Sequence, residues 1–285
     1  MTKPKKSPTS ANLPGAPANA CLTVPAQRLG TGGRSAVHDA LAAEEPLELR
    51  LHTPADPLPL AVLMRTPGHD RELIGGWLLS EGLFPAELSL SPDDENPNVW
   101  HLHTPEWERL AAGARLGVSS SACGVCGTGS IERLAVRAGP LPVSGPPLPW
   151  PLLAGLPQQL QAAQPLFRDT GGVHAAGLFT AAGELLAAFE DVGRHNATDK
   201  VLGWALRQGL DRSALVLCVS SRAGFEIVQK AVMAGVPVVV AVGAASSLAV
   251  DTAQAFGLTL CAFVRQGRVT VYTGAERLEL PDALP

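Results

Sequence analysis

The amino-acid sequence predicts an α/β fold, in which a mainly parallel β-sheet with helices on both faces follows a smaller mixed α+β part. Continuous Val, Leu and Ala runs alternate with helical segments from residue 152 onward, as in sheets that are covered on both faces. Residues 21–137 instead hold short elements of mixed pattern. A proline-rich stretch at 138–151 separates the two and is interpreted as a connector. We therefore expect a mixed N-terminal part at 21–137 and an α/β domain at 152–285.

The N-terminal part is predicted from local patterns. Residues 1–20 are rich in Pro, Ala, Ser and Lys without periodicity, which predicts a disordered tail. Apolar side chains alternate with period two at 47–52, as in a half-buried strand. A helix is expected to open at Thr66–Asp70 and to run to about Ser80, because its apolar residues recur at helical spacing. Further strands are predicted at 58–64, 88–91 and 99–103, and a short helix at 130–137.

The α/β domain is predicted as a regular alternation of the two element types. Helices are expected at 152–163, 195–208, 224–234 and 248–256. Strands are expected at 178–179, 185–189, 214–219, 237–242, 258–264 and 269–272. Ligands of such sheets lie beyond the carboxyl ends of the strands, so the loops after the strands are where we expect a site.

Composition argues against two classes of partner. The 285 residues carry a net charge of -4, and only 5% of them are aromatic, so neither a basic field nor stacking side chains favour nucleic acid. The N-terminus lacks the apolar region of a secretory signal. The uncharged stretch at 231–250 is interrupted by Gly235, Pro237 and Gly243, which argues against a membrane span. We expect a cytoplasmic protein with no nucleic-acid or membrane partner.

Two of the five cysteines, Cys123 and Cys126, form a C-x-x-C motif within a run of Ser and Gly. This spacing commonly lowers the pKa of one thiol, and the small neighbours allow a large partner to approach. The pair can close a disulfide, supply half of a structural zinc site, or pass a sulfur atom. Cys218 and Cys261 lie in apolar runs and are expected to pack as small hydrophobic residues.

Four loops of the α/β domain hold unusual residues. They contribute His174, then Arg194 with His195, then Arg222 with Lys230 one turn into the next helix, and finally the turn at 263–268. Lys200 and Lys230 are the only lysines outside the tail, and cations at helix starts suit an anionic ligand. The alternatives are a charged helix cap and ordinary solvated turns. The sequence argues against a zinc deaminase, because His174 is followed by Ala175-Ala176 instead of His-x-Glu.

Taken together, the motifs resemble the FdhD family, the sulfur carrier proteins that formate dehydrogenase needs for maturation. The resemblance rests on CGVCG at 123–127, TGGVHAA at 170–176, EDVGRHNATDK at 190–200 and FEIVQKA at 225–231. The sequence departs from the usual family pattern at Ala223-Gly224 and at 243–246.

The resemblance implies a fold, a reaction and partners. Family members are cytoplasmic homodimers with a cytidine-deaminase-like core that has lost its zinc site, so no permanent metal is expected. They accept sulfur from a cysteine desulfurase as a persulfide and pass it to the molybdenum (or tungsten) bis-guanine-dinucleotide cofactor, which then enters formate dehydrogenase. The cofactor is thus a bound substrate, and guanosine diphosphate is expected to bind in its place.

The resemblance also implies roles for individual residues. Cys123 is expected to carry the persulfide, and Cys126 to assist its transfer. The cofactor is expected to be held by His174, Arg194, His195, Arg222, Lys230, Phe263, Val264, Arg265, Gln266, Gly267 and Arg268. Glu190 and Asp191 are expected to accept hydrogen bonds from a guanine edge or to orient Arg194. The alternative is a cofactor-binding chaperone whose C-x-x-C binds zinc or docks a partner without sulfur transfer.

Overall fold

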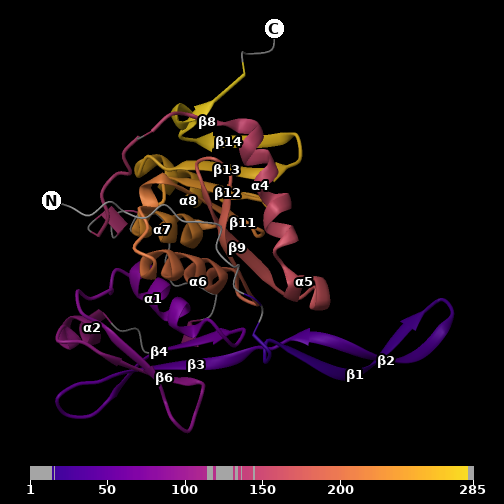
Figure 1. Cartoon of the computed structure of the whole chain (residues 1–285), viewed down its shortest axis with the longest axis vertical. Helices are drawn as coiled ribbons and strands as arrows, with labels where there is room; N and C mark the ends of the chain where they lie inside the picture. Colours follow the sequence, from indigo (N-terminus) through magenta and orange to yellow (C-terminus); the bar gives the residue numbers. More distant parts are fainter. Residues whose placement is uncertain are drawn as a thin grey trace.

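The computed structural model describes residues 15, 17–113, 118–119, 131, 134–135, 137–143 and 145–281. Figure 1 shows a smaller sheet in the N-terminal part, a larger sheet with its helices next to it, and a two-stranded ribbon that projects from the body. The predicted tail lies largely outside the described residues. At its end Ala20 is buried, and its backbone carbonyl accepts a hydrogen bond from the N–H of Ala43 at 2.8 Å.

The N-terminal sheet has the strand order β5-β6-β3-β4-β7. Its strands are β3 (Glu45–Leu51), β4 (Leu58–Arg65), β5 (Ser89–Pro92), β6 (Val99–His103) and β7 (Val118–Ser119). Leu47, Leu49 and Leu51 are each fully buried, which confirms the period of two predicted for β3. They pack with apolar residues of α1 (Asp70–Ser80) and α2 (Trp107–Gly113). The β5–β6 hairpin and helix α1 are confirmed, whereas α2 was not predicted.

The larger sheet has the strand order β10-β9-β11-β12-β13-β14. Its strands are β9 (His174–Thr180), β10 (Leu185–Asp191), β11 (Leu215–Val219), β12 (Val238–Ala241), β13 (Thr259–Arg265) and β14 (Arg268–Thr273). Only β11–β12 and β12–β13 pair in parallel, whereas β9–β10, β9–β11 and β13–β14 pair antiparallel. The prediction of a mainly parallel sheet is therefore wrong. Short turns join β9 to β10 and β13 to β14, and a short turn joins antiparallel neighbours only.

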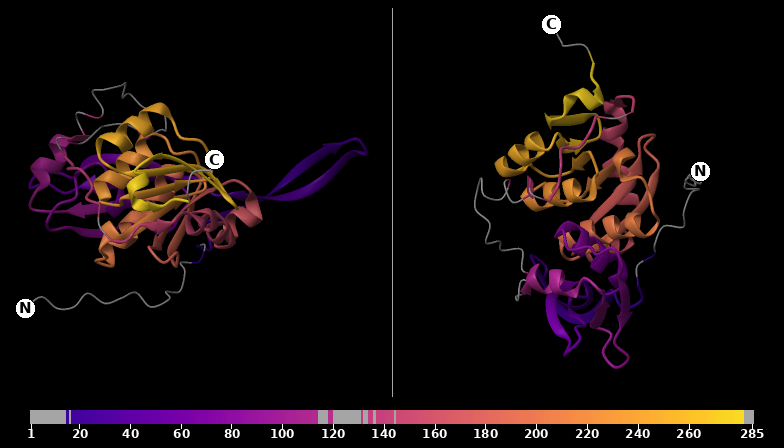
Figure 2. Two further views of the ribbon diagram at one scale, coloured as in Figure 1. Left: turned by 90° about the horizontal axis from the view of Figure 1, so that it is seen from above. Right: turned by 90° about the vertical axis from the view of Figure 1, so that its left-hand side faces the viewer.

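Helices cover both faces of this sheet, as predicted (Figure 2). Helices α6 (Arg194–Arg207), α7 (Phe225–Ala234) and α8 (Ser247–Ala255) pack on one face. Helix α4 (Trp150–Ala162) packs on the other face through Leu153, Leu156 and Leu160. The strands between the two layers are continuous apolar runs because both of their faces are buried.

Helix α1 crosses α6 at two glycines, and this crossing joins the two sheets. A Cβ atom on Gly76 would overlap the backbone carbonyl of Asp199, and one on Gly203 would overlap the carbonyl of Glu72. Only glycine permits so close an approach of two helix backbones. The crossing fixes the N-terminal part against the start of α6, where two of the predicted site residues lie.

Several elements of the structure were not predicted from the sequence. Helix α5 (Pro165–Thr170) precedes β9, and β8 (Leu148–Pro149) pairs in parallel with β15 (Leu278–Glu279). The ribbon consists of β1 (Cys21–Gly30) and β2 (Gly33–Ala42), which pair antiparallel along their whole length. Its mixed polar and apolar residues do not show a clear alternation along either strand, so neither strand was predicted.

Candidate functional site

The loops that hold most of the predicted site residues lie along one edge of the larger sheet. His174 begins β9 and lies opposite Asp191, the last residue of β10. The N–H of Ser220, just beyond β11, donates to the carbonyl of Ala175 at 2.9 Å. Gly243, beyond β12, accepts a hydrogen bond on its carbonyl from the N–H of Phe263 at 2.9 Å. Backbone hydrogen bonds therefore connect three of the predicted loops into one edge.

His174, Arg194, His195 and Arg222 meet at this edge as a cationic cluster, the name we use for these four residues. The pKa of His174 lies below its ordinary value. Burial is the largest cause, and the charges of the neighbouring Arg194, His195 and Arg222 lower it further. A His174 pKa below its ordinary value favours the neutral imidazole at neutral pH. Two guanidinium groups and two imidazoles within interaction range are suited to bind a polyanion.

Glu226, which the sequence reasoning did not assign, belongs to the cluster. Its Oε2 lies 2.7 Å from His195 Nε2, and this hydrogen bond is the main cause that lowers the pKa of Glu226. The ionised carboxylate therefore fixes the orientation of the His195 ring. The sequence could have indicated this role, because Glu226 lies in the first turn of α7, close after Arg222, and so near the predicted site.

The turn at 263–268 begins at the same edge. Phe263 adopts a positive φ of 52° at an irregular point of the β13–β14 pairing, and its side chain is 40% exposed. Such a backbone is uncommon for a bulky residue and marks a candidate functional position. Arg265, Gln266, Gly267 and Arg268 are exposed. Val264 is fully buried within the sheet core, so only its backbone is left to contact a ligand.

Lys230 is not brought to the cluster. Its ammonium is buried and lies 2.9 and 2.7 Å from the two carboxylate oxygens of Asp199, one of which accepts from Ser80. Lys200 likewise forms a buried ion pair, because its Nζ lies 2.7 Å from Asp191 Oδ2. The two lysines thus neutralise buried carboxylates, so the prediction that they bind an anionic ligand is wrong.

Glu190 and Asp191 also have structural partners. Glu190 accepts hydrogen bonds from the N–H groups of Leu166 and Phe167 at the start of α5. Asp191 is fully buried and accepts from Thr66, Gly193 and Asn196 in addition to its pairing with Lys200. Asp191 is therefore closed to a ligand, whereas Glu190 is half-buried with each of its oxygens already accepting one backbone hydrogen bond.

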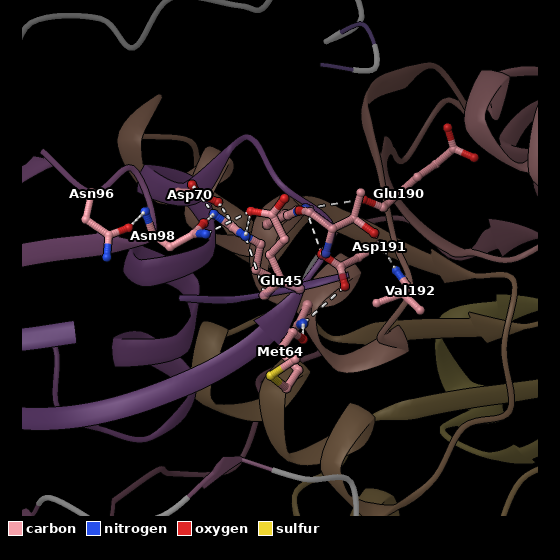
Figure 3. A network of polar contacts seen from close by, with 12 residues as sticks. Glu45, Met64, Asp70, Asn96, Asn98, Glu190, Asp191 and Val192 are labelled. Atoms are coloured by element: carbon pink, nitrogen blue, oxygen red, sulfur yellow. Dashed lines mark hydrogen bonds and ion pairs between the residues drawn. The ribbon is translucent and has the colours of Figure 1, made fainter. Parts of the chain in front are cut away.

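Figure 3 shows how this polar network joins the two parts of the chain. The N–H of Val192 donates to Thr66 Oγ1 at 3.0 Å, and Asn196 donates to the carbonyl of Met64 at 2.6 Å. On the N-terminal side Arg65, which is 1% exposed, donates to Asp70 and Asn98. The network holds the end of β4 against the end of β10, directly before Arg194 and His195. Buried hydrogen bonds therefore position the cluster.

The two cysteines of the C-x-x-C motif, Cys123 and Cys126, lie outside the described residues, so their predicted roles stay predictions. Burial raises the pKa of Cys218, and it raises that of Cys261 to about 12. Both thiols stay protonated at neutral pH and are poor nucleophiles. Both residues pack in the core of the larger sheet, as predicted.

A groove lies in the N-terminal part, away from all predicted site residues. This groove of about 590 Å³ has His52, His103 and Trp107 in its wall. His52 also lies 2.8 Å from His101, which contacts Asp93 at 3.0 Å. Among the residues that the structure describes, no group of three or more His, Cys, Asp or Glu side chains is arranged to hold a metal ion. No helix within the described ranges is long and apolar enough to cross a bilayer.

Comparison with known proteins identifies relatives over nearly the whole chain. A protein of Nocardia farcinica named "Sulfur carrier protein FdhD" is 46% identical over 261 residues, which cover 88% of this chain and 92% of the relative. A protein of the same name from Corynebacterium efficiens is 48% identical, with coverages of 83% and 90%. Another from Anaeromyxobacter dehalogenans is 46% identical, with coverages of 95% and 98%.

The fold has a counterpart among solved structures. The crystal structure of a putative formate dehydrogenase accessory protein from Desulfotalea psychrophila superposes with a TM-score of 0.72 at 23% identity, covering 91% of this chain and 100% of that one. Residues 42–279 match the model of the FdhD/NarQ family, a range that begins at the base of the ribbon and ends with β15. The chain therefore belongs to the FdhD/NarQ family.

Proposed function

We propose that this protein is a cytoplasmic, homodimeric sulfur carrier that serves the maturation of formate dehydrogenase. Sulfur comes from a cysteine desulfurase, is held as a persulfide on Cys123, and passes to the molybdenum bis-guanine-dinucleotide cofactor before that cofactor enters the enzyme. The observation that carries the proposal is the 46–48% identity, over most of both chains, with proteins named as sulfur carriers. The cationic cluster supports the cofactor-binding half of it.

The sulfur chemistry needs only the two thiols of the C-x-x-C motif. The Cys123 thiolate attacks the outer sulfur of a desulfurase persulfide, which forms a persulfide on Cys123 and releases the desulfurase thiolate. Attack of the Cys126 thiolate on the Cys123 sulfur then forms a disulfide and releases hydrosulfide. The two electrons that reduce the outer sulfur come from the thiol pair, so the step balances without another reductant. Two cellular thiols, or one dithiol, then reduce the Cys123–Cys126 disulfide for the next cycle and leave as a disulfide themselves.

The cationic cluster has the chemistry to hold the diphosphate groups of the cofactor. Arg194 and Arg222 supply forked donors that match phosphate oxygens, and the N-terminus of α6 adds partial positive charge. The exposed Phe263 lies next along the same edge and offers a ring face for a guanine base. Charged and aromatic groups are thus combined within one edge of the sheet.

Mass spectrometry tests the sulfur half of the proposal. After incubation with a cysteine desulfurase and cysteine, the peptide that contains Cys123 is expected to gain about 32 Da, the mass of one sulfur atom. The peptides of Cys218 and Cys261 are internal controls, because both buried thiols stay protonated and inaccessible. Tightly bound zinc without any adduct on Cys123 would instead favour the alternative, a cofactor chaperone.

Nucleotide binding tests the cofactor half. Replacing Arg222 or Arg194 by glutamine is expected to weaken the binding of guanosine diphosphate about tenfold, because each change removes charged hydrogen bonds to phosphate. Isothermal titration calorimetry measures the affinity. Arg207→Gln, at the opposite end of the same helix α6, is the matched control and should bind normally. Charge reversal at Arg265 or Arg268 tests the 263–268 turn in the same way, and unchanged affinity would remove that turn from the site.

A further inference from the structure

The groove of about 590 Å³ lies where β3 and β6 of the N-terminal sheet end, and rings form much of its wall. The imidazole of His52, directly after β3, stacks on that of His103, the last residue of β6, with the ring centroids 4.0 Å apart. Trp107 begins α2 and lines the same groove. The remaining apolar wall consists of Pro54, Leu88 and Pro105. Grooves that are lined by aromatic rings are suited to bind extended, proline-rich segments.

Hydrogen bonds hold the elements that form the groove in place. The N–H of His52 donates to the carbonyl of Leu102 at 2.9 Å, which extends the pairing of β3 with β6 by one residue. In α2 the carboxylate of Glu106 accepts from the N–H of Ala86 at 2.6 Å and pairs with Arg109 at 2.8 Å. These contacts fix the start of α2 against the segment that contains Leu88. The groove is therefore preformed, as binding sites usually are.

The part of the chain that forms the groove is strongly acidic. Residues 44–113 contain thirteen Asp and Glu but only four Arg and no Lys, so their net charge is -9 with neutral His. Residues 145–281 contain ten acidic and ten basic residues and are neutral by the same count. The negative charge of the protein is therefore concentrated around the groove. Such a field attracts basic ligands and disfavours nucleic acid and anionic lipid.

Exposed carboxylates lie next to the apolar wall. Glu87 is itself part of the wall and is exposed. A turn brings Asp56 close to the wall, because its backbone carbonyl accepts from Oγ1 of the wall residue Thr53 at 2.8 Å. Glu108 directly follows Trp107 in α2 and is exposed. A Lys or Arg side chain can pair with these carboxylates and also interact with the face of the Trp107 ring.

We propose that this groove binds an extended, basic, proline-containing segment of a partner protein. The prolines and aliphatic side chains of the segment pack against Trp107 and the stacked imidazoles. Its Lys or Arg groups pair with Asp56, Glu87 and Glu108. The groove lies away from the cationic cluster, so this binding site is separate from the proposed sulfur transfer and goes beyond it.

The stacked imidazole of His52 makes this binding depend on pH. Burial, and then the charges of His103 and His101, hold the pKa of His52 below its ordinary value, so the ring is neutral at pH 7. The other charged groups around these rings are Arg50 on β3, Asp93 on the β5–β6 loop, Glu87 in the wall and Glu106 on α2. Protonation of His52 in acid places a positive charge in the wall. The affinity for a basic segment should therefore fall as the pH decreases from about 7 to about 5.

Fluorescence anisotropy with a labelled peptide and the full-length chain tests the site. A peptide of about twelve residues that repeats Lys-Pro-Leu is expected to bind with a Kd of about 0.1 mM or lower, and a Glu-Pro-Leu peptide of the same length should not bind. Glu87→Lys and Trp107→Leu are each expected to raise the Kd about tenfold, because they remove a carboxylate and a ring from the wall. Glu184→Lys is the matched control, since it makes the same charge change in the β9–β10 turn of the larger sheet and should bind normally.

The outcomes separate this groove from the proposed function. A Kd above about 1 mM for the Lys-Pro-Leu peptide overturns the proposal, and so does a Kd that Glu87→Lys and Trp107→Leu leave unchanged. Equal affinity for a Lys-Gly-Leu peptide would contradict the role of proline. Guanosine diphosphate should bind every variant with wild-type affinity, which also verifies that the variants are folded. The sulfur adduct on Cys123 is measured independently, so it decides the carrier role alone.

Discussion

Cells that carry only a Cys123→Ala variant of this protein are expected to contain inactive formate dehydrogenase. Alanine has no sulfur to attack the desulfurase persulfide, so no sulfur reaches the cofactor. Enzyme activity in extracts should fall by about a hundredfold or more, as when a covalent nucleophile is removed. The variant protein itself should fold and accumulate normally, which immunoblotting verifies.

The neighbouring thiols provide the controls for this experiment. Cys21 lies at the base of the ribbon and is half-buried, and a Cys21→Ala chain should support full activity. Cys126→Ala should still form the adduct on Cys123 but release its sulfur slowly, because the resolving thiolate is missing. Full formate dehydrogenase activity with Cys123→Ala would mean that this residue is not the carrier.

Elements whose signal is local could be predicted from the sequence. The alternation in β3 and the helical spacing in α1 each reflect burial on one side, and both elements formed at the expected positions. The direction of strands β9, β10 and β14 could not be predicted from their own residues. A buried apolar run has the same pattern in parallel and antiparallel sheets. The short turns at 181–184 and 266–267 did indicate antiparallel pairing, because two strands joined by so few residues form a hairpin.

The composition of the candidate site was predictable, but the partners of its charges were not. Arg194, His195 and Arg222 meet as expected because strand ends of one sheet share an edge. Lys200 follows His195 by five residues and Lys230 follows Arg222 by eight, yet their side chains point inward to Asp191 and Asp199. A one-dimensional pattern does not distinguish a lysine that binds a ligand from one that neutralises a buried acid. Only packing of α6 against α1 and α7 decides which it is.

The Lys200–Asp191 pair leads to the second large prediction. Both side chains are essentially inaccessible to solvent, and Lys200 also donates to the carbonyl of Thr66 at 2.9 Å. Lys200→Met keeps the length of the side chain and removes its charge, which leaves the Asp191 carboxylate buried without a cation. Breaking such a pair typically costs about 3–5 kcal/mol. Since domains have total stabilities of about 5–15 kcal/mol, the urea midpoint should fall markedly.

Two further variants show whether the cost comes from the unpaired charge. In Lys200→Met/Asp191→Asn the buried charge is absent, so the double variant should be more stable than the sum of the two single losses predicts. Arg207→Gln, which breaks an exposed ion pair with Glu72, should change stability by less than about 1 kcal/mol. Because Asp191 also holds Thr66 and Asn196, Lys200→Met should loosen the start of α6 and weaken guanosine diphosphate binding at Arg194. A Lys200→Met protein with wild-type urea midpoint and nucleotide affinity would show that the buried pair neither stabilises the fold nor positions the cationic cluster.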